Sequence, residues 1–170
     1  MSKADSDTTR HAAEVRKEID VSAPVGEVFG FWTDYENFPR VMEEVREVRD
    51  TGNGRSHWVV SGPAGVPVEW DAVITRLVPN ELFAWRSAEG SAVEQAGVVR
   101  FEQNADGTAT RVRIRFSYNP PAGAVGQALA ALLGADPEKK VDETLMRIKT
   151  FIETGSPRRD AAQTTRGRGE

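Results

Sequence analysis

The hydrophobic pattern near the C-terminus predicts one long amphipathic helix, running from Asp136 to Gly155. Its apolar residues recur at spacings of four, three and four, which places them along one face of a helix. They are Val141, Leu145, Ile148 and Ile152. Asp136 is a suitable N-cap, and Gly155 is a typical C-terminal stop. A helix with a single apolar face needs a partner surface to cover it.

Upstream, most of the chain from Glu14 to Tyr118 alternates between apolar and polar positions, which is typical of half-buried β-strands. The predicted strands cover residues 14–21, 44–50, 56–61, 68–75, 82–87, 91–103 and 111–118. The charged segment 44–50 is expected at a sheet edge. Lys17 breaks the apolar face of the first strand, so its ammonium group needs an acidic partner or access to water. We predict an α+β fold, in which a curved antiparallel sheet of about seven strands wraps around the C-terminal helix and can leave a cavity beside it.

Short helices are predicted at three further places. Apolar residues at helical spacing, including Val28 and Trp32, predict a helix within residues 22–32, directly after the first strand. A broken helical turn over 35–42 follows it, and a short apolar helix is expected at 123–134. The first two would lead the chain from the first strand into the rest of the sheet.

The last two strands form the clearest predicted hairpin. Asp106-Gly107 favours a two-residue type I′ turn, which sets the register of both strands. The expected cross-strand pairs are Glu102 with Arg111, Phe101 with Val112 and Val99 with Ile114. In this register the apolar residues of the last strand point toward the helix, and its arginines face water.

Composition narrows the class of protein. The chain has 170 residues, which is enough for one domain with a real core. Its net charge of -4 gives no overall attraction to nucleic acid. It has no cysteine, which excludes disulfides, thiol catalysis and thiolate metal sites, and fits a cytoplasmic protein. No apolar run approaches the roughly 20 residues of a membrane span. We expect a disordered leader at 1–13, one domain at 14–155 and a disordered tail at 156–170.

Several stretches resemble one known family. They are EIDVSAPVGEVFGFWTDYENFPRVM, the tryptophan of VEWDAVI, LFAWRS, VVRF followed by TRVRIRFSYNPPAG, and MRIKTFIE. Together they are similar to the polyketide cyclase/dehydrase group of the START-like (SRPBCC, helix-grip) superfamily, which also includes coenzyme Q-binding proteins, over residues 14–153. The resemblance implies a helix-grip fold with an apolar cavity between the sheet and the long helix. It implies no single chemistry, because the superfamily contains ligand carriers, aromatase/cyclases and a ribosome-associated toxin.

Aromatic side chains dominate the predicted inward face, and they suit either a pocket for a flat or isoprenoid-like molecule or an ordinary core. The candidate cavity residues are Met42, Trp58, Trp70, Trp85, Gln95, Phe101, Ile114, Phe116, Tyr118, Leu145 and Ile148. No cofactor and no metal are expected, since the sequence has no histidine pair at ligand spacing and no Gly-rich phosphate loop.

No recognised catalytic motif is present, so the candidates for catalysis are single residues. They are His57, Arg86 and Tyr118. His57 is the only group of the fold expected to titrate near neutral pH, but it faces water if Trp58 faces the cavity. The orientation of Arg86 depends on the loop at Glu89-Gly90. A two-residue turn there points Arg86 inward, and one extra loop residue points Trp85 inward instead.

The arginines of the last strand, with Arg100 nearby, allow two interpretations. Arg111, Arg113 and Arg115 could form a surface for RNA or an acidic partner. Glu102, and also Glu69 and Asp71 on a nearby strand, could instead neutralise them. We favour a solvated, salt-bridged face, because no aromatic platform accompanies the arginines, and we expect no stable nucleic-acid binding.

We therefore expect binding or transport of a hydrophobic small molecule, such as a lipid, quinone or polyketide-like compound, in the cavity. Segments 35–42 and 62–67 would frame its entrance. A cyclase/dehydrase-type enzyme is the first alternative, and it requires polar side chains such as Arg86, Tyr118, Gln95 or His57 to converge inside the cavity. A protein, ribosome or RNA interaction module, with a continuous basic patch, is the second. We expect a monomer or weak dimer.

Overall fold

The computed structural model describes residues 13–62, 65–91, 94–119 and 136–155. Residues 1–12 of the predicted leader, the tail and the short helix at 123–134 lie outside the described residues, as does part of the loop at 62–67. Ala13, which was predicted to end the leader, is the first residue of a strand.

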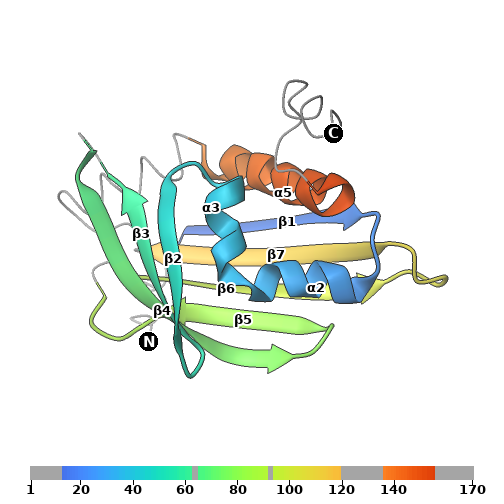
Figure 1. Ribbon diagram of the computed structural model, residues 1–170, viewed down its shortest axis with the longest axis horizontal. Coiled ribbons are helices and arrows are strands. Elements are labelled where there is room, and N and C mark those ends of the chain that lie inside the picture. The colour runs from blue at the N-terminus through green and yellow to red at the C-terminus, as the bar shows by residue number, and fades with distance from the viewer. Residues whose placement is uncertain (1–12, 63–64, 92–93, 120–135, 156–170) are drawn as a thin grey trace, which may run out of the picture.

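The described strands form one antiparallel sheet in the order β1-β7-β6-β5-β4-β3-β2. They are β1 (Ala13–Val21), β2 (Val45–Gly52), β3 (Arg55–Ser61), β4 (Pro67–Val78), β5 (Leu82–Ser87), β6 (Glu94–Gln103) and β7 (Thr110–Asn119). The first strand thus pairs with the last, and the charged strand β2 lies at the other edge as predicted. The sheet curves so strongly that β2 and β3 run across the direction of β1 and β7 (Figure 1).

Helices cover the concave side of this sheet. They are α2 (Val25–Thr33), the 3-10 turn η1 (Tyr35–Asn37), α3 (Phe38–Val41) and α5 (Pro137–Thr154). Helix α5 begins and ends where the sequence predicts. The Asp136 carboxylate accepts a hydrogen bond from the Lys139 N–H at 3.2 Å, and Gly155 ends the helix with a φ of 83°. In Figure 1, α5 lies along β1 and β7.

Lys17 on β1 helps to hold the start of α5. Its Nζ lies 3.2 Å from the carboxylate of Asp142 and 3.6 Å from that of Glu138, both on α5. The first turns of α5 thus supply the acidic partners that Lys17 needs on the otherwise apolar face of its strand.

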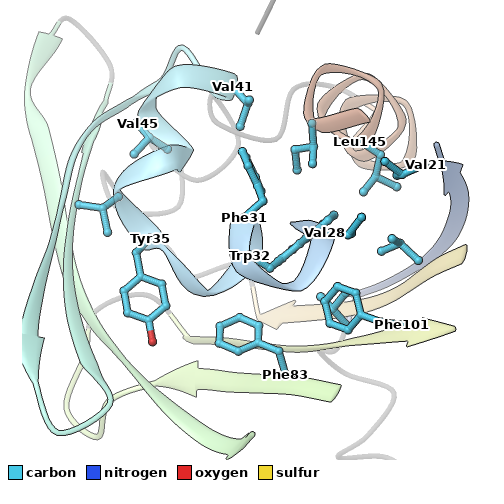
Figure 2. Close-up of a cluster of buried hydrophobic side chains, with 14 of the residues drawn as sticks. Val21, Val28, Phe31, Trp32, Tyr35, Val41, Val45, Phe83, Phe101 and Leu145 are labelled. Atoms are coloured by element: carbon cyan, nitrogen blue, oxygen red, sulfur yellow. The ribbon is translucent and has the colours of Figure 1, made fainter. Parts of the chain in front are cut away.

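The core lies between α2, α5 and the sheet (Figure 2). Val28 on α2 and Val99 and Val112 in the sheet are fully buried, and Ile148 on α5 is 2% exposed. The Phe31 ring lies 5.4 Å from that of Phe151, which joins α2 to α5. Val28 and Ile148, which belong to the stripes predicted for these helices, are thus buried in the core, whereas the contact between the two helices is made by Phe31 and Phe151, which lie outside those stripes.

The β6–β7 hairpin has the predicted register, with Glu102 opposite Arg111, but not the predicted turn. A type I′ turn needs positive φ at both central residues, and only Gly107 has it, with φ 75°. The turn is wider, because Asn104 Oδ1 accepts hydrogen bonds from the N–H groups of Thr108 and Ala109 at 3.0 and 3.1 Å. These side-chain bonds stabilise a longer loop without shifting the strands.

Candidate functional site

A cavity of about 170 Å³ lies between α5, the η1–α3 segment and the concave face of the sheet. Apolar and aromatic side chains make up nearly all of its lining. The lining residues are Trp32, Tyr35, Phe38, Met42, Val45, Ser56, Trp58, Trp70, Ala72, Val73, Ile74, Phe83, Trp85, Gln95, Ile114, Phe116, Lys140, Val141, Thr144, Leu145 and Ile148. The cavity lies where the resemblance places one.

Most of the candidate cavity residues come together in this lining. They are Met42, Trp58, Trp70, Trp85, Gln95, Ile114, Phe116, Leu145 and Ile148. Phe101 and Tyr118 lie elsewhere. Phe101 packs under α2, with its ring 5.3 Å from that of Phe29, and Tyr118 lines a separate pocket beside the end of β5, the start of β6 and the end of β7. Strand alternation predicts which face a side chain occupies, but not how far along the strand the cavity extends.

Twelve lining residues were not among the candidates, and Tyr35, Phe38, Phe83 and Lys140 are four of them. Tyr35 and Phe38 belong to the segment that was expected only at the entrance, and Phe83 shares the inward face of β5 with Trp85. Lys140 could have been found, because Lys140, Thr144 and Ile148 follow one another at helical spacings of four.

The loop between β5 and β6 is long enough to point Trp85 inward. Trp85 pairs with Gly97 on β6, and its indole lies directly over that glycine. The Trp85 Nε1–H donates a hydrogen bond to Gln95 Oε1 at 3.0 Å, which fixes the ring at the cavity wall. Arg86 consequently points outward, where its guanidinium donates to the Ser87 carbonyl at 3.0 Å.

Two stacked tryptophans form another wall. Trp58 and Trp70 lie opposite each other on β3 and β4, with ring centroids 6.1 Å apart and planes inclined by only 6°. The Trp58 Nε1–H donates to Ser56 Oγ at 3.0 Å, and the Phe38 ring lies 5.6 Å from Trp58. Flat apolar surfaces of this kind suit the face of a ring compound.

A few polar groups also reach this cavity. Lys140 lines it, and its Nζ lies 2.7 Å from Glu44 Oε2. The phenol of Tyr35 is another such group, and burial, together with the nearby charge of Asp50, raises its pKa. The phenol therefore stays protonated at neutral pH and can donate a hydrogen bond.

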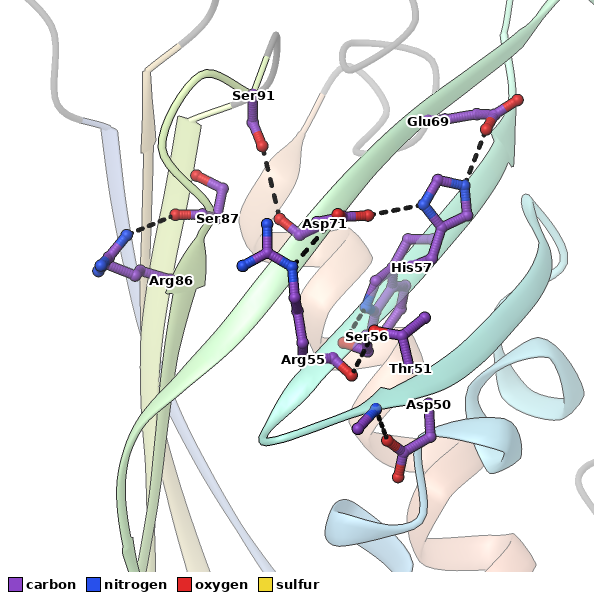
Figure 3. Close-up of polar contacts among 12 residues, drawn as sticks. Asp50, Thr51, Arg55, Ser56, His57, Glu69, Asp71, Arg86, Ser87 and Ser91 are labelled. Atoms are coloured by element: carbon purple, nitrogen blue, oxygen red, sulfur yellow. Dashed lines mark hydrogen bonds and ion pairs between the residues drawn. The ribbon is translucent and has the colours of Figure 1, made fainter.

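His57 lies on the outer face of the sheet, between two carboxylates (Figure 3). Its Nδ1 lies 2.6 Å from Asp71 Oδ1, and its Nε2 lies 2.8 Å from Glu69 Oε1. The hydrogen bond with Asp71, and then that with Glu69, raises the pKa of His57 and favours the imidazolium. Both ring nitrogens are occupied, and His57 is absent from the cavity lining. The structure therefore does not bring His57, Arg86 and Tyr118 together in the cavity.

The arginines of β7 are paired with carboxylates, but mostly not with the predicted ones. Arg111 Nε lies 2.8 Å from Asp20 Oδ1 on β1, and Arg113 lies within 3.3 Å of Glu18 and 3.2 Å of Glu102. Of the predicted partners only Glu102 contacts them, because β1 pairs with β7, whereas Glu69 and Asp71 lie on the distant strand β4. This face therefore carries alternating charges.

Within the described ranges, no group of three or more histidine, aspartate or glutamate side chains is placed to hold a metal ion. No helix in the part of the chain that the structure describes is long and apolar enough to cross a membrane.

Known proteins share this architecture. Residues 21–147 match the family model described as polyketide cyclase/dehydrase and lipid transport. An uncharacterised 17.2 kDa protein of Streptomyces lincolnensis is 35% identical over 141 residues, which cover 83% of this chain and 90% of that protein.

Solved structures show the same fold. A crystal structure from Deinococcus radiodurans is 29% identical, with a TM-score of 0.67 over 84% of this chain and 98% of the other. The Zhui aromatase/cyclase from Streptomyces sp. R1128 is 20% identical, with a TM-score of 0.63 over 84% and 94% of the two chains. A START superfamily protein from Mycobacterium smegmatis is 13% identical, with a TM-score of 0.61 over 86% and 99%. The sheet that wraps around α5 and the apolar cavity between them are consistent with the family matched over residues 21–147. The chain belongs to the polyketide cyclase/dehydrase and lipid transport family.

Proposed function

We propose that this protein binds a hydrophobic small molecule in the cavity between the sheet and α5, as a carrier or binding protein. The observation that carries the proposal is the lining itself, in which a stacked tryptophan pair and further aromatic rings enclose about 170 Å³. Moving apolar ligand surface out of water into such a site contributes about 25 cal/mol per Å².

The volume limits the ligand. An engineered apolar cavity of about 150 Å³ is large enough for benzene, whereas drug-sized ligands need pockets of roughly 300 Å³ or more. We therefore expect a ring compound of one or two rings, or the end of a longer lipid, quinone or polyketide-like molecule whose remainder extends through the entrance.

The test is native mass spectrometry of protein purified from its source organism, followed by organic extraction and identification of any bound molecule. We expect a stoichiometric apolar compound and a higher Tm when that compound is added back to the emptied protein. Ala72→Leu, which fills the cavity, should weaken binding at least about tenfold. Ala84→Leu, on the outer face of the neighbouring strand β5, is the matched control and should leave binding unchanged. An empty protein whose Tm responds to no compound in a panel of lipids, quinones and aromatic polyketides contradicts the proposal.

A cyclase/dehydrase-type enzyme is the second candidate, and the family match supports it. The polar side chains that line the cavity are the ones available for such chemistry, above all Tyr35, Ser56, Gln95 and Lys140. The distinguishing experiment compares the cyclised products of a linear poly-β-ketone with and without the protein. If adding the protein changes the product distribution, and the Tyr35→Phe variant gives the same distribution as no protein, the result would favour the enzyme over the carrier.

A further inference from the structure

Trp85, in the lining of the cavity, lies over a residue that has no side chain. It pairs with Gly97 across β5 and β6, and three carbon atoms of its six-membered ring lie within 3.0 Å of the position that a Cβ atom on Gly97 would take. The indole therefore fills space on the inward face of β6 that a side chain at position 97 would otherwise occupy.

The indole is held in this place from two sides. Its Nε1–H donates a hydrogen bond to Gln95 Oε1 at 3.0 Å, and the backbone N–H of Gln95 donates in turn to Ser87 Oγ at 3.1 Å. On the same strand as Trp85, the Phe83 ring lies 5.7 Å away with the two planes inclined by 29°. Phe83 pairs with Val99, two residues along β6 from Gly97, so it lies beside the indole and not beneath it. A hydrogen bond and ring packing thus fix Trp85 at the cavity wall.

The space that Trp85 fills differs from that filled by the stacked pair of tryptophans. Trp58 and Trp70 stack on each other, and Phe38 lies 5.6 Å from Trp58, so loss of either indole leaves a ring that can relax into the gap. The cavity that remains after a truncation depends on how far its neighbours collapse. Beneath Trp85 lies only the backbone of Gly97, on a strand that is paired with both β5 and β7. Because such a strand cannot move into the gap, this space would stay open and join the cavity.

We propose that Trp85 determines the upper size of the ligand, because it closes the part of the cavity that lies over Gly97. With the indole in place the cavity has about 170 Å³, which suits one or two rings, whereas larger ligands need roughly 300 Å³ or more. Gln95 is a positioning residue, since it holds the indole in place. This inference rests on the proposed function and adds a size class to it: flat compounds of two fused rings fit inside the cavity, and compounds of three fused rings do not.

The test compares naphthalene, which has two fused rings, with phenanthrene, which has three. Their affinities for the full chain come from titrations that follow the fluorescence of each hydrocarbon, and the ratio of the two dissociation constants is compared between proteins. Neither probe has a polar group, and the general gain from the larger apolar surface of phenanthrene cancels in this comparison. In Trp85→Leu we expect phenanthrene to gain at least about tenfold over naphthalene, relative to the parent chain.

Three further variants separate this role from a general loosening of the cavity. Trp58→Leu is the matched control, since it makes the same change in the same lining and should alter the ratio by less than about threefold. Trp85→Phe keeps a smaller ring and should shift the ratio by less than Trp85→Leu, and it serves as the test if Trp85→Leu does not fold. Gln95→Leu removes the acceptor of the indole N–H, so it should shift the ratio in the same direction and move the indole N–H signal of Trp85 upfield in the ¹⁵N spectrum.

The possible outcomes distinguish the size limit from the proposed function. An unchanged ratio in the Trp85 variants, or an equal shift in Trp58→Leu, would overturn the size limit and leave the apolar cavity standing. An unchanged ratio in Gln95→Leu would overturn the role of Gln95. If neither hydrocarbon binds the parent chain or any variant, the proposed function is overturned and the size limit with it.

Discussion

The indole of Trp85 occupies the space that a side chain on Gly97 would need. A Cβ atom built on Gly97 would lie 2.4 Å from Cη2 and 2.5 Å from Cζ2 of Trp85. Real Cβ atoms do not approach other heavy atoms so closely, so the ring can lie at the cavity wall only because position 97 is glycine. Two residues on neighbouring strands thus shape the cavity together.

Gly97→Ala should therefore destabilise the protein, by about 1–3 kcal/mol, because the added methyl group displaces the Trp85 ring or the backbone beneath it. Urea unfolding measures the change. Gly30→Ala is the control, since Gly30 lies in α2 with open space around its Cβ position and a negative φ. That substitution should be neutral or stabilising by up to about 1 kcal/mol. Equal effects of the two substitutions would show that Trp85 does not constrain position 97.

The His57–Asp71 pair should make stability depend on pH. The pKa of His57 is raised in the folded protein, so its contribution is complete below about pH 6.5, its unfolded value, and is lost as the pH rises through the folded pKa. The pKa of Asp71 is lowered, so its contribution is present above about pH 4 and is lost as the pH falls. The pair should therefore stabilise most between these values.

His57→Gln should remove the part of this dependence that lies above pH 6. The effect is expected to stay below about 1 kcal/mol, because the carboxylates are solvent-accessible. The measurement is the free energy of unfolding at pH 6 and pH 8.5 for both proteins. An identical loss of stability between these pH values in His57→Gln would assign the dependence to other groups.

The N-cap of α5 should contribute measurably to stability. Asp136→Ala removes the acceptor for the Lys139 N–H and should lower the free energy of unfolding by about 1 kcal/mol. Asp136→Ser keeps a capping oxygen and should retain most of the stability. If both variants unfold at the same urea concentration as the parent chain, the cap does not limit the stability of the helix.

Leu145→Ala should enlarge the cavity from the side of α5. Leu145 is 3% exposed and lines the cavity, so its truncation should destabilise the protein by about 2–5 kcal/mol. A ligand that fills the new space should recover part of this loss by mass action, with a larger rise in Tm than in the parent protein. Met146→Ala is the control on the same helix, because Met146 is 52% exposed and should change stability by no more than about 0.5 kcal/mol.

The features that the sequence predicted well depend on residues close together in the chain. The caps at Asp136 and Gly155 and the period of the apolar stripe determine α5 locally, and alternation determines which face of each strand is buried. The β6–β7 register was predicted from a two-residue turn that the structure does not contain, but it is correct, since a shift by one residue would have exposed Val112 and buried Arg111. The segments that resemble the family carry this same local information.

Tertiary structure decided what depends on loop length and on strand neighbours. The longer β5–β6 loop turned Trp85 inward and Arg86 outward, and the pairing of β1 with β7 gave Arg111 its partner Asp20. The position of α2 put Phe101 in the core and outside the cavity. The periodicity of one strand does not specify which strand lies beside it or how far a helix extends across it. The sequence alone thus determined the fold and its inward face, whereas packing between distant segments determined the cavity.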